Sequence, residues 1–144
     1  MASKIHQFLA DFDGADPEEA LEMLMEFGQK LPALSKDRAG QAPPSGCRIA
    51  ECQTPVYLWV DVVNGTIQLE AVVPEQSPTV RGFVALLVAG ISGANPREVA
   101  DLPDDFLPLL GLSGTLGMTR SKGFRGIVSR IKREAAQTDG KTPV

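Results

Sequence analysis

Hydrophobic and polar residues alternate along two runs that flank Asn64-Gly65, and this alternation predicts a β-hairpin. An Asn-Gly pair favours a two-residue turn, because both turn positions adopt positive φ. The first strand runs from Val56 to Val63, and counting outward from the turn places Val60 opposite Leu69. The apolar face would then hold Val56, Leu58, Val60, Val62, Ile67, Leu69, Ala71 and Val73. The other face would hold Tyr57, Trp59, Asp61, Gln68 and Glu70. We expect Val60 and Leu69 to be buried together.

Before the hairpin, the apolar positions recur at helical spacing. Asp16 can cap a helix that begins at Pro17 and ends at about Lys30, with acidic residues facing its positive end. A shorter helix over about Lys4 to Phe12 precedes it. The stretch from Leu31 to Pro55 is broken by prolines and glycines, so it predicts a long irregular connection.

After the hairpin, Ser77-Pro78 opens a helix that runs to about Gly90 and is apolar nearly all round, as expected for a helix packed on the sheet. Asn95-Pro96 and Asp104-Asp105 start two short helices. Ser121 can cap a last helix over about Lys122 to Ala136.

This order of elements predicts an α+β fold, in which a small antiparallel sheet built on the central hairpin packs against helices on one of its faces. With 144 residues, of which 43% are hydrophobic, the chain is long enough for one domain with a real core. We expect that domain to cover residues 1–137 and residues 138–144 to form a flexible tail.

The net charge of -4 argues against a surface that tracks nucleic acid or an anionic membrane, because both require a broad positive field. The N-terminal residues lack the apolar run of a secretory signal, and Phe83 to Ile91 is too short to cross a bilayer. We therefore expect a cytoplasmic protein, in which two cysteines are reduced thiols.

Several common chemistries are excluded by what the sequence lacks. His6 is the only histidine, so histidine-based triads are hard to build. The spacing of Cys47, Cys52 and His6 matches no common zinc pattern, and there is no Gly-rich phosphate loop or dinucleotide fingerprint. We expect no bound metal and no cofactor.

Cys52 is the candidate reactive atom. It lies in the polar loop from Arg48 to Val56, directly before a rigid strand, and a thiolate is a nucleophile that requires no metal. From spacing alone, a small buried hydrophobe is the more common role for a free cysteine. Cys47 is either a resolving thiol for Cys52 or a bystander.

Four segments in order resemble the SufE family of sulfur-acceptor proteins, over about residues 5 to 135. Glu51-Cys52-Gln53-Thr54-Pro55-Val56-Tyr57 is similar to the stretch that carries the family's acceptor cysteine. The other three are Phe27-Gly28-Gln29-Lys30-Leu31-Pro32-Ala33-Leu34, Val80-Arg81-Gly82-Phe83-Val84-Ala85-Leu86-Leu87 and Met118-Thr119-Arg120-Ser121-Lys122-Gly123-Phe124. Any one of them is weak evidence, but four in the same order are specific.

The resemblance implies a non-enzymatic sulfur carrier. Cys52 would take persulfide sulfur from a cysteine desulfurase of the SufS/CsdA type, stimulate that enzyme and pass the sulfur to an iron–sulfur scaffold. The pyridoxal phosphate would belong to the desulfurase. Arg120 stands where the family element carries arginine, and it is either a cation near Cys52 that would stabilise the thiolate or a surface arginine at a helix start. Glu51 replaces the family's usual glycine, and its carboxylate would raise the pKa of the neighbouring thiol and so act as a modulator. The resemblance also implies that Cys52 is sheltered in the resting protein.

Two other functions remain open from the residues. A thiol oxidoreductase would use Cys47 and Cys52, although their spacing differs from the close pair Cys-x-x-Cys. A nucleic-acid adaptor would use the basic C-terminal helix, with Arg120, Lys122, Arg125, Arg130, Lys132 and Arg133. Net charge and the scarcity of aromatic residues disfavour the adaptor.

Overall fold

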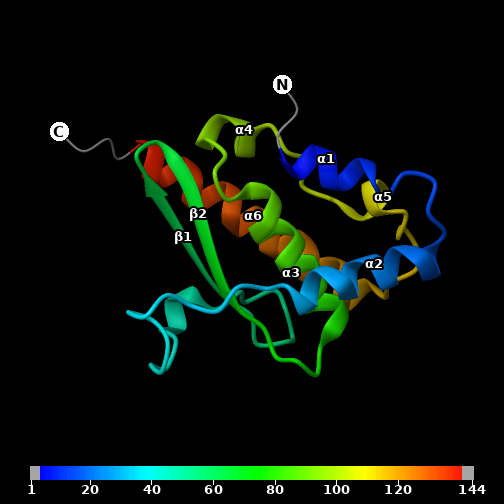
Figure 1. The fold of residues 1–144 in the computed structure, drawn as a ribbon, viewed down its shortest axis with the longest axis horizontal. Helices are drawn as coiled ribbons and strands as arrows, with labels where there is room; N and C mark the ends of the chain where they lie inside the picture. The colour runs from blue at the N-terminus through cyan, green and yellow to red at the C-terminus, as the bar shows by residue number, and fades with distance from the viewer. Residues whose placement is uncertain (1–3, 141–144) are drawn as a thin grey trace.

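The computed structural model describes the backbone of residues 4–140 and the side chains of residues 4–137 (Figure 1). The helices before the hairpin are α1 (Lys4–Ala10), α2 (Pro17–Gln29) and the short 3-10 helix η1 (Ser45–Cys47). The strands are β1 (Tyr57–Val63) and β2 (Thr66–Val72). The helices that follow are α3 (Pro78–Ile91), α4 (Pro96–Ala100), α5 (Leu107–Leu110) and α6 (Met118–Gly140). The α+β prediction is confirmed.

The predicted hairpin register is confirmed. β1 pairs antiparallel with β2, with Val63 opposite Thr66 and Val60 opposite Leu69. Asn64 has a φ of 52° and Gly65 a φ of 79°, as an Asn-Gly turn requires. The turn therefore fixes which side chains face the helices.

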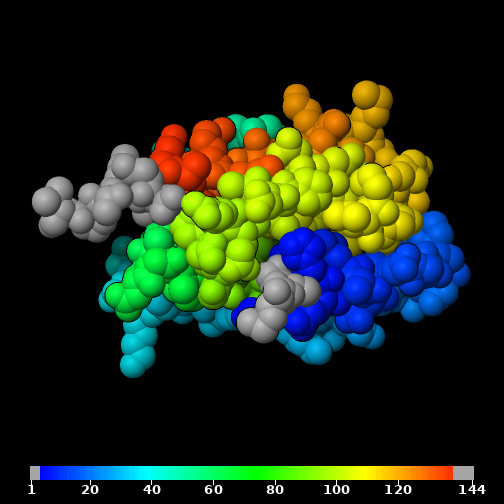
Figure 2. All heavy atoms as spheres, turned by 90° about the horizontal axis from the view of Figure 1, so that it is seen from above, coloured from blue at the N-terminus to red at the C-terminus, as the bar shows by residue number. Residues whose placement is uncertain are grey.

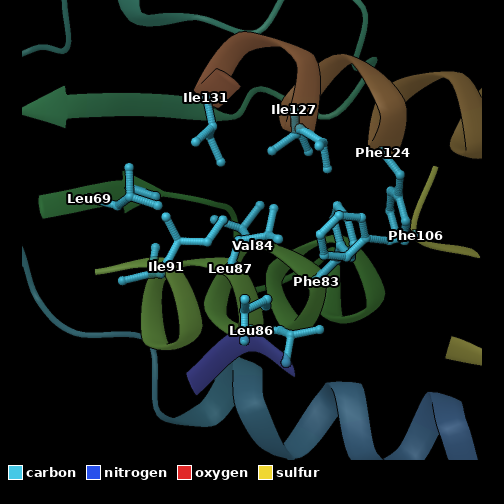
Figure 3. Packing of buried hydrophobic residues seen from close by; sticks show 14 of the residues in the cluster. Leu69, Phe83, Val84, Leu86, Leu87, Ile91, Phe106, Phe124, Ile127 and Ile131 are labelled. Carbon is cyan, nitrogen blue, oxygen red and sulfur yellow. The ribbon is translucent and has the colours of Figure 1, made fainter. Parts of the chain in front are cut away.

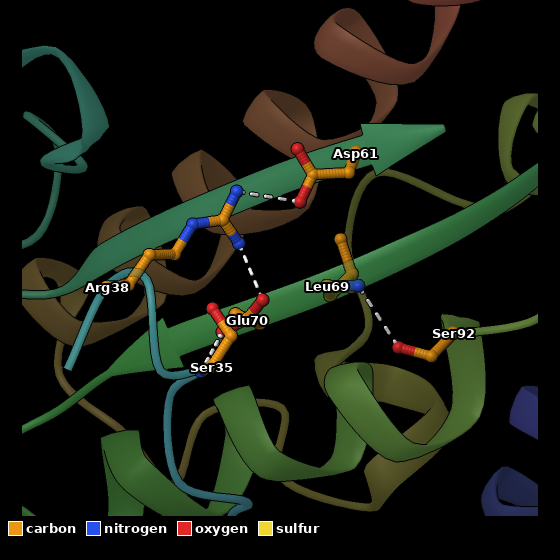
Figure 4. A network of polar contacts seen from close by, with 6 residues as sticks. All are labelled: Ser35, Arg38, Asp61, Leu69, Glu70 and Ser92. Atoms are coloured by element: carbon orange, nitrogen blue, oxygen red, sulfur yellow. Dashed lines mark hydrogen bonds and ion pairs between the residues drawn. The ribbon is translucent and has the colours of Figure 1, made fainter. Parts of the chain in front are cut away.

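The expectation that Val60 is buried with Leu69 is wrong. Leu69 is buried, but Val60 and Val62 are only half-buried, because the two edges of the hairpin near its turn are covered differently. On the β2 edge, the Ile67 N–H donates to the Ala94 carbonyl at 2.7 Å, and the Leu69 N–H donates to the Ser92 hydroxyl at 3.2 Å (Figure 4). In the described part of the chain, no backbone segment pairs in this way with β1 at Val60 or Val62.

The long connection crosses the outer face of the sheet and is fixed there by Arg38 (Figure 4). The Arg38 guanidinium pairs with Asp61 of β1 at 2.9 Å and with Glu70 of β2 at 2.6 Å. It also lies over the Trp59 ring, 5.2 Å from the centroid. Between Leu31 and Pro55, η1 is the one regular helix or strand, as the prolines and glycines predict. The polar outer face of the hairpin is therefore covered by a loop.

The core forms around α3, which lies between α2 on one side and the sheet with α6 on the other (Figure 3). The Phe83 ring stacks on Phe124 of α6 at a centroid distance of 4.1 Å and meets Phe106 edge-on at 6.1 Å. On the opposite side, α2 and α3 cross so closely that a Cβ at Gly82 would lie 2.0 Å from the Leu24 carbonyl oxygen. Burial on both sides explains why α3 is apolar nearly all round.

Some predicted helix boundaries differ from the structure. α1 ends at Ala10 rather than Phe12, and α5 begins at Leu107, whose N–H donates to Asp105 at 3.0 Å. α6 begins at Met118, so Ser121 lies inside the helix and is not its cap.

The C-terminal end of α6 also differs. The helix continues past the predicted end to Gly140, and residues 141–144 lie outside the described residues. The single domain over residues 1–137 and the flexible tail from Thr138 stay predictions. Within residues 4–140, no helix has the length and apolarity that a membrane crossing needs.

Candidate functional site

Cys52 lies on a short loop that is closed at its base. The Ile49 N–H donates to the Val56 carbonyl at 2.9 Å, and Arg48 forms a bridge with Tyr57 at the start of β1. Within the loop, the Cys52 N–H donates to the Ile49 carbonyl at 3.3 Å. The hairpin thus supplies the rigid base that the sequence predicts for this cysteine.

The loop packs against two glycines of α6. A Cβ at Gly123 would lie 3.2 Å from the Cys52 sulfur, and a Cβ at Gly126 would lie 2.5 Å from Cβ of Glu51. A side chain at either position would press on the loop, so the glycines allow it to lie directly on the helix. Gly126 was not predicted as part of the site. The sequence signal for it is a pair of glycines three residues apart within one helix, where each is less favourable than alanine by about 1 kcal/mol.

The prediction that Cys52 is sheltered is confirmed, since the residue is 6% exposed. Beside it lies a cavity of about 310 Å³. The cavity is lined by Cys52, Gln53, Thr54, Val80, Gly117, Thr119 and Arg120. The structure therefore brings Arg120, at the start of α6, to the same cavity as the candidate thiol.

Burial raises the pKa of the Cys52 thiol above its ordinary value. Hydrogen bonds from the Thr54 N–H and hydroxyl to the sulfur oppose this shift, as do the positive charges of Arg48 and Arg120. The Thr54 hydroxyl also lies 3.5 Å from the Ser77 hydroxyl at the start of α3. The resting thiol is thus held in its neutral form, with groups around it that favour a negative charge on sulfur.

Glu51 is exposed and rests its side chain on the backbone of α6 at Gly126. Its predicted effect on the thiol pKa stays a prediction.

Cys47 lies in a different environment. It belongs to η1 and is half-buried, and burial raises its pKa while the nearby charge of Arg130 lowers it. Arg130 of α6 donates to the carbonyls of Gly46 and Arg48 and pairs with Glu134. Seven residues separate Arg130 from Gly123, which is about 10 Å along a helix. The segments that carry Cys47 and Cys52 thus contact different turns of α6, and both cysteines are free thiols.

The basic residues of the last helix divide into two groups. Lys132 donates to the Leu102 carbonyl at 2.6 Å and pairs with Asp104 at 2.9 Å, and Arg130 is engaged with η1. The exposed members are Arg120, Lys122, Arg125 and Arg133. In the part of the chain that the structure describes, no group of three or more His, Cys, Asp or Glu residues is placed to hold a metal ion.

Residues 6–135 match the SufE family, which is described as an Fe-S metabolism associated domain. An uncharacterized SufE-like protein of Mycobacterium tuberculosis strain H37Rv is 30% identical over 140 residues, which cover 96% of each protein. The cysteine desulfuration protein SufE of Plasmodium vivax is 25% identical over 119 residues, or 81% of this chain and 46% of that protein.

Among solved structures, the fold is similar to the solution structure of a hypothetical protein from Thermus thermophilus. The two align with a TM-score of 0.78 and 29% identity, covering 95% of this chain and 97% of the other. At this identity and coverage, the likeness extends to the whole arrangement of helices around the hairpin.

Proposed function

Because the chain belongs to the SufE family of Fe-S metabolism associated domains, we propose that Cys52 accepts persulfide sulfur from a cysteine desulfurase of the SufS/CsdA type. The observation that carries this proposal is the sheltered position of Cys52 beside a cavity of about 310 Å³ that Arg120 also lines. A carrier that holds reactive sulfur must limit its loss to stray thiols, and a buried acceptor atom does so.

The transfer is a thiol–disulfide type exchange. The Cys52 thiolate attacks the terminal sulfur of the desulfurase persulfide, forms a new sulfur–sulfur bond and breaks the one in the enzyme. The desulfurase cysteine leaves as a thiolate, which takes up the proton that Cys52 released. No electrons are gained or lost overall, so the step needs no further oxidant or reductant.

The environment of Cys52 supports both the neutral thiol of the resting protein and the thiolate that reacts. Burial keeps the free thiol neutral and unreactive, whereas Arg120 and Thr54 stabilise negative charge on sulfur once the thiol ionises. The Glu51 carboxylate, next to the thiol in sequence, would oppose ionisation until a partner or Arg120 compensates it.

On this proposal the pyridoxal phosphate belongs to the desulfurase, and the chain is a carrier rather than an enzyme. Removing the terminal sulfur frees the desulfurase for another turnover, so the chain would stimulate it. The sulfur would then pass from Cys52 to an iron–sulfur scaffold.

Intact-mass measurement after incubation with cysteine and the desulfurase tests the proposal. We expect one added sulfur atom on the wild type and on Cys47→Ser, and none on Cys52→Ser, because a hydroxyl does not accept sulfur. Sulfide release by the desulfurase should follow the same order. Equal loss of both activities in the two variants would refute the carrier function and favour a dithiol mechanism, in which each thiol is needed.

A further inference from the structure

One stripe of α6 faces solvent at the start of the helix. Met118, Lys122 and Arg125 are spaced at i, i+4 and i+7, which places them on one face, and all three are exposed. Met118 is 89% exposed, the highest value among the exposed large hydrophobic residues that the structure describes. Figure 2 shows side chains of the first half of α6, in orange, projecting from the edge of the molecule. We refer to these three residues as the basic face.

Within the described residues, the charges of the basic face have no acidic partner. The ion pairs of α6 in this part of the chain involve Arg130 and Lys132, and none involves Lys122 or Arg125. The helix also has no acidic residue between Met118 and Arg133. A protein with a net charge of -4 therefore carries two cations without an ion-pair partner among the described residues at this place, and the exposed Glu51 side chain lies beside them at Gly126.

The basic face borders the site of Cys52. Gly123 and Gly126, which receive the cysteine loop, lie on the neighbouring side of the same two helical turns. The residues that line the cavity beside Cys52 include Gly117, Thr119 and Arg120, which flank Met118 in sequence. A protein that brings its sulfur to Cys52 therefore approaches next to this part of α6.

We infer that Met118, Lys122 and Arg125 form the docking surface for an acidic patch beside the persulfide cysteine of the desulfurase. This inference rests on the proposed function. The two cations would accelerate the encounter and set its salt dependence. Met118 would supply an adaptable apolar contact, for which methionine suits a binding surface.

A protein fits this surface better than a nucleic acid does. The basic face holds two cations and no aromatic side chain on which a base could stack, whereas binding to nucleic acid depends on many phosphate contacts or on stacking. A single exposed apolar anchor flanked by charges is the arrangement of a protein interface with a polar rim.

Binding of the desulfurase to Cys52→Ser protein, measured at low and at high salt, tests the surface without any sulfur transfer. We expect Lys122→Glu/Arg125→Glu to weaken binding at low salt by about tenfold or more and to flatten its salt dependence. Met118→Ser should weaken binding at both salt concentrations. The matched control, Lys36→Glu/Arg97→Glu, reverses two exposed cations outside the basic face and should bind like the parent.

In proteins that keep Cys52, the same reversals should raise the desulfurase KM for the chain and leave kcat at saturation unchanged. If Lys122→Glu/Arg125→Glu bound the desulfurase like the parent and left KM unchanged, the docking surface would be overturned. The proposed function would still stand if the wild type gained a persulfide on Cys52. If the wild type gained no sulfur yet bound the desulfurase through these residues, the proposed function would fail and the surface would stand. A fluorescent single-stranded oligonucleotide tests the other class of partner. If Lys122→Glu/Arg125→Glu lost binding to this oligonucleotide while its binding to the desulfurase stayed unchanged, the inference would be overturned in favour of a nucleic acid.

Discussion

Gly126→Ala should make Cys52 more reactive by loosening the loop that carries it. The new methyl carbon would lie 2.5 Å from Cβ of Glu51 and 2.9 Å from its Cγ, so the loop cannot stay where it is. Overpacking of this kind costs about 1–3 kcal/mol. Because the strain disappears when the loop lifts from α6, the free energy of lifting falls by the same amount. That corresponds to an increase of about 5-fold to 150-fold in the fraction of molecules whose cysteine loop is lifted from α6.

The assay is alkylation of Cys52 by iodoacetamide in a Cys47→Ser background, followed by intact mass. We expect the rate to rise within that range. The urea midpoint should fall by less than the overpacking alone implies, since alanine favours the helix by about 1 kcal/mol and offsets part of that cost. Gly123→Ala should act more weakly, because its Cβ would lie 3.2 Å from the sulfur. Gly46→Ala is the control, as its Cβ would meet nothing within 4 Å. An unchanged alkylation rate in Gly126→Ala would show that contact with this glycine does not hold the loop.

Three further predictions concern the thiol and the sheet. Because burial raises the pKa of Cys52, its alkylation rate should reach half-maximum at a higher pH than that of an ordinary thiol, and Thr54→Val should move this midpoint higher still. Because the pKa of Cys52 is higher in the folded than in the unfolded state, the neutral thiol contributes to the free energy of unfolding fully at pH values below the unfolded-state pKa. This contribution is lost as the pH rises through the folded-state pKa, so Cys52→Ala should reduce the loss of stability at alkaline pH. Leu69→Asp, at a buried position, should lower the free energy of unfolding by more than about 3 kcal/mol, whereas Val60→Asp, at a half-buried one, should cost clearly less. Equal shifts of the urea midpoint would contradict the unequal cover of the two strands.

The sequence alone determined the features that depend on neighbouring residues. The Asn64-Gly65 turn and the alternation around it fixed the register of the hairpin, because each dihedral preference acts within a few residues of the chain. Asp16 and Asn95 cap α2 and α4 as predicted, for the same reason. The four ordered segments also identified the family and the candidate cysteine, since the resemblance is carried by the residues themselves.

Tertiary structure decided which of these residues meet. Arg38 lies 23 residues from Asp61 and 32 from Glu70, and Arg130 lies 84 residues from Gly46, so no local pattern predicts that they pair. The contact of Glu51 with Gly126 likewise depends on how α6 packs against the sheet. Periodicity shows which face of a strand is apolar, but the cover over that face comes from distant segments, which is why Leu69 is buried and Val60 is not.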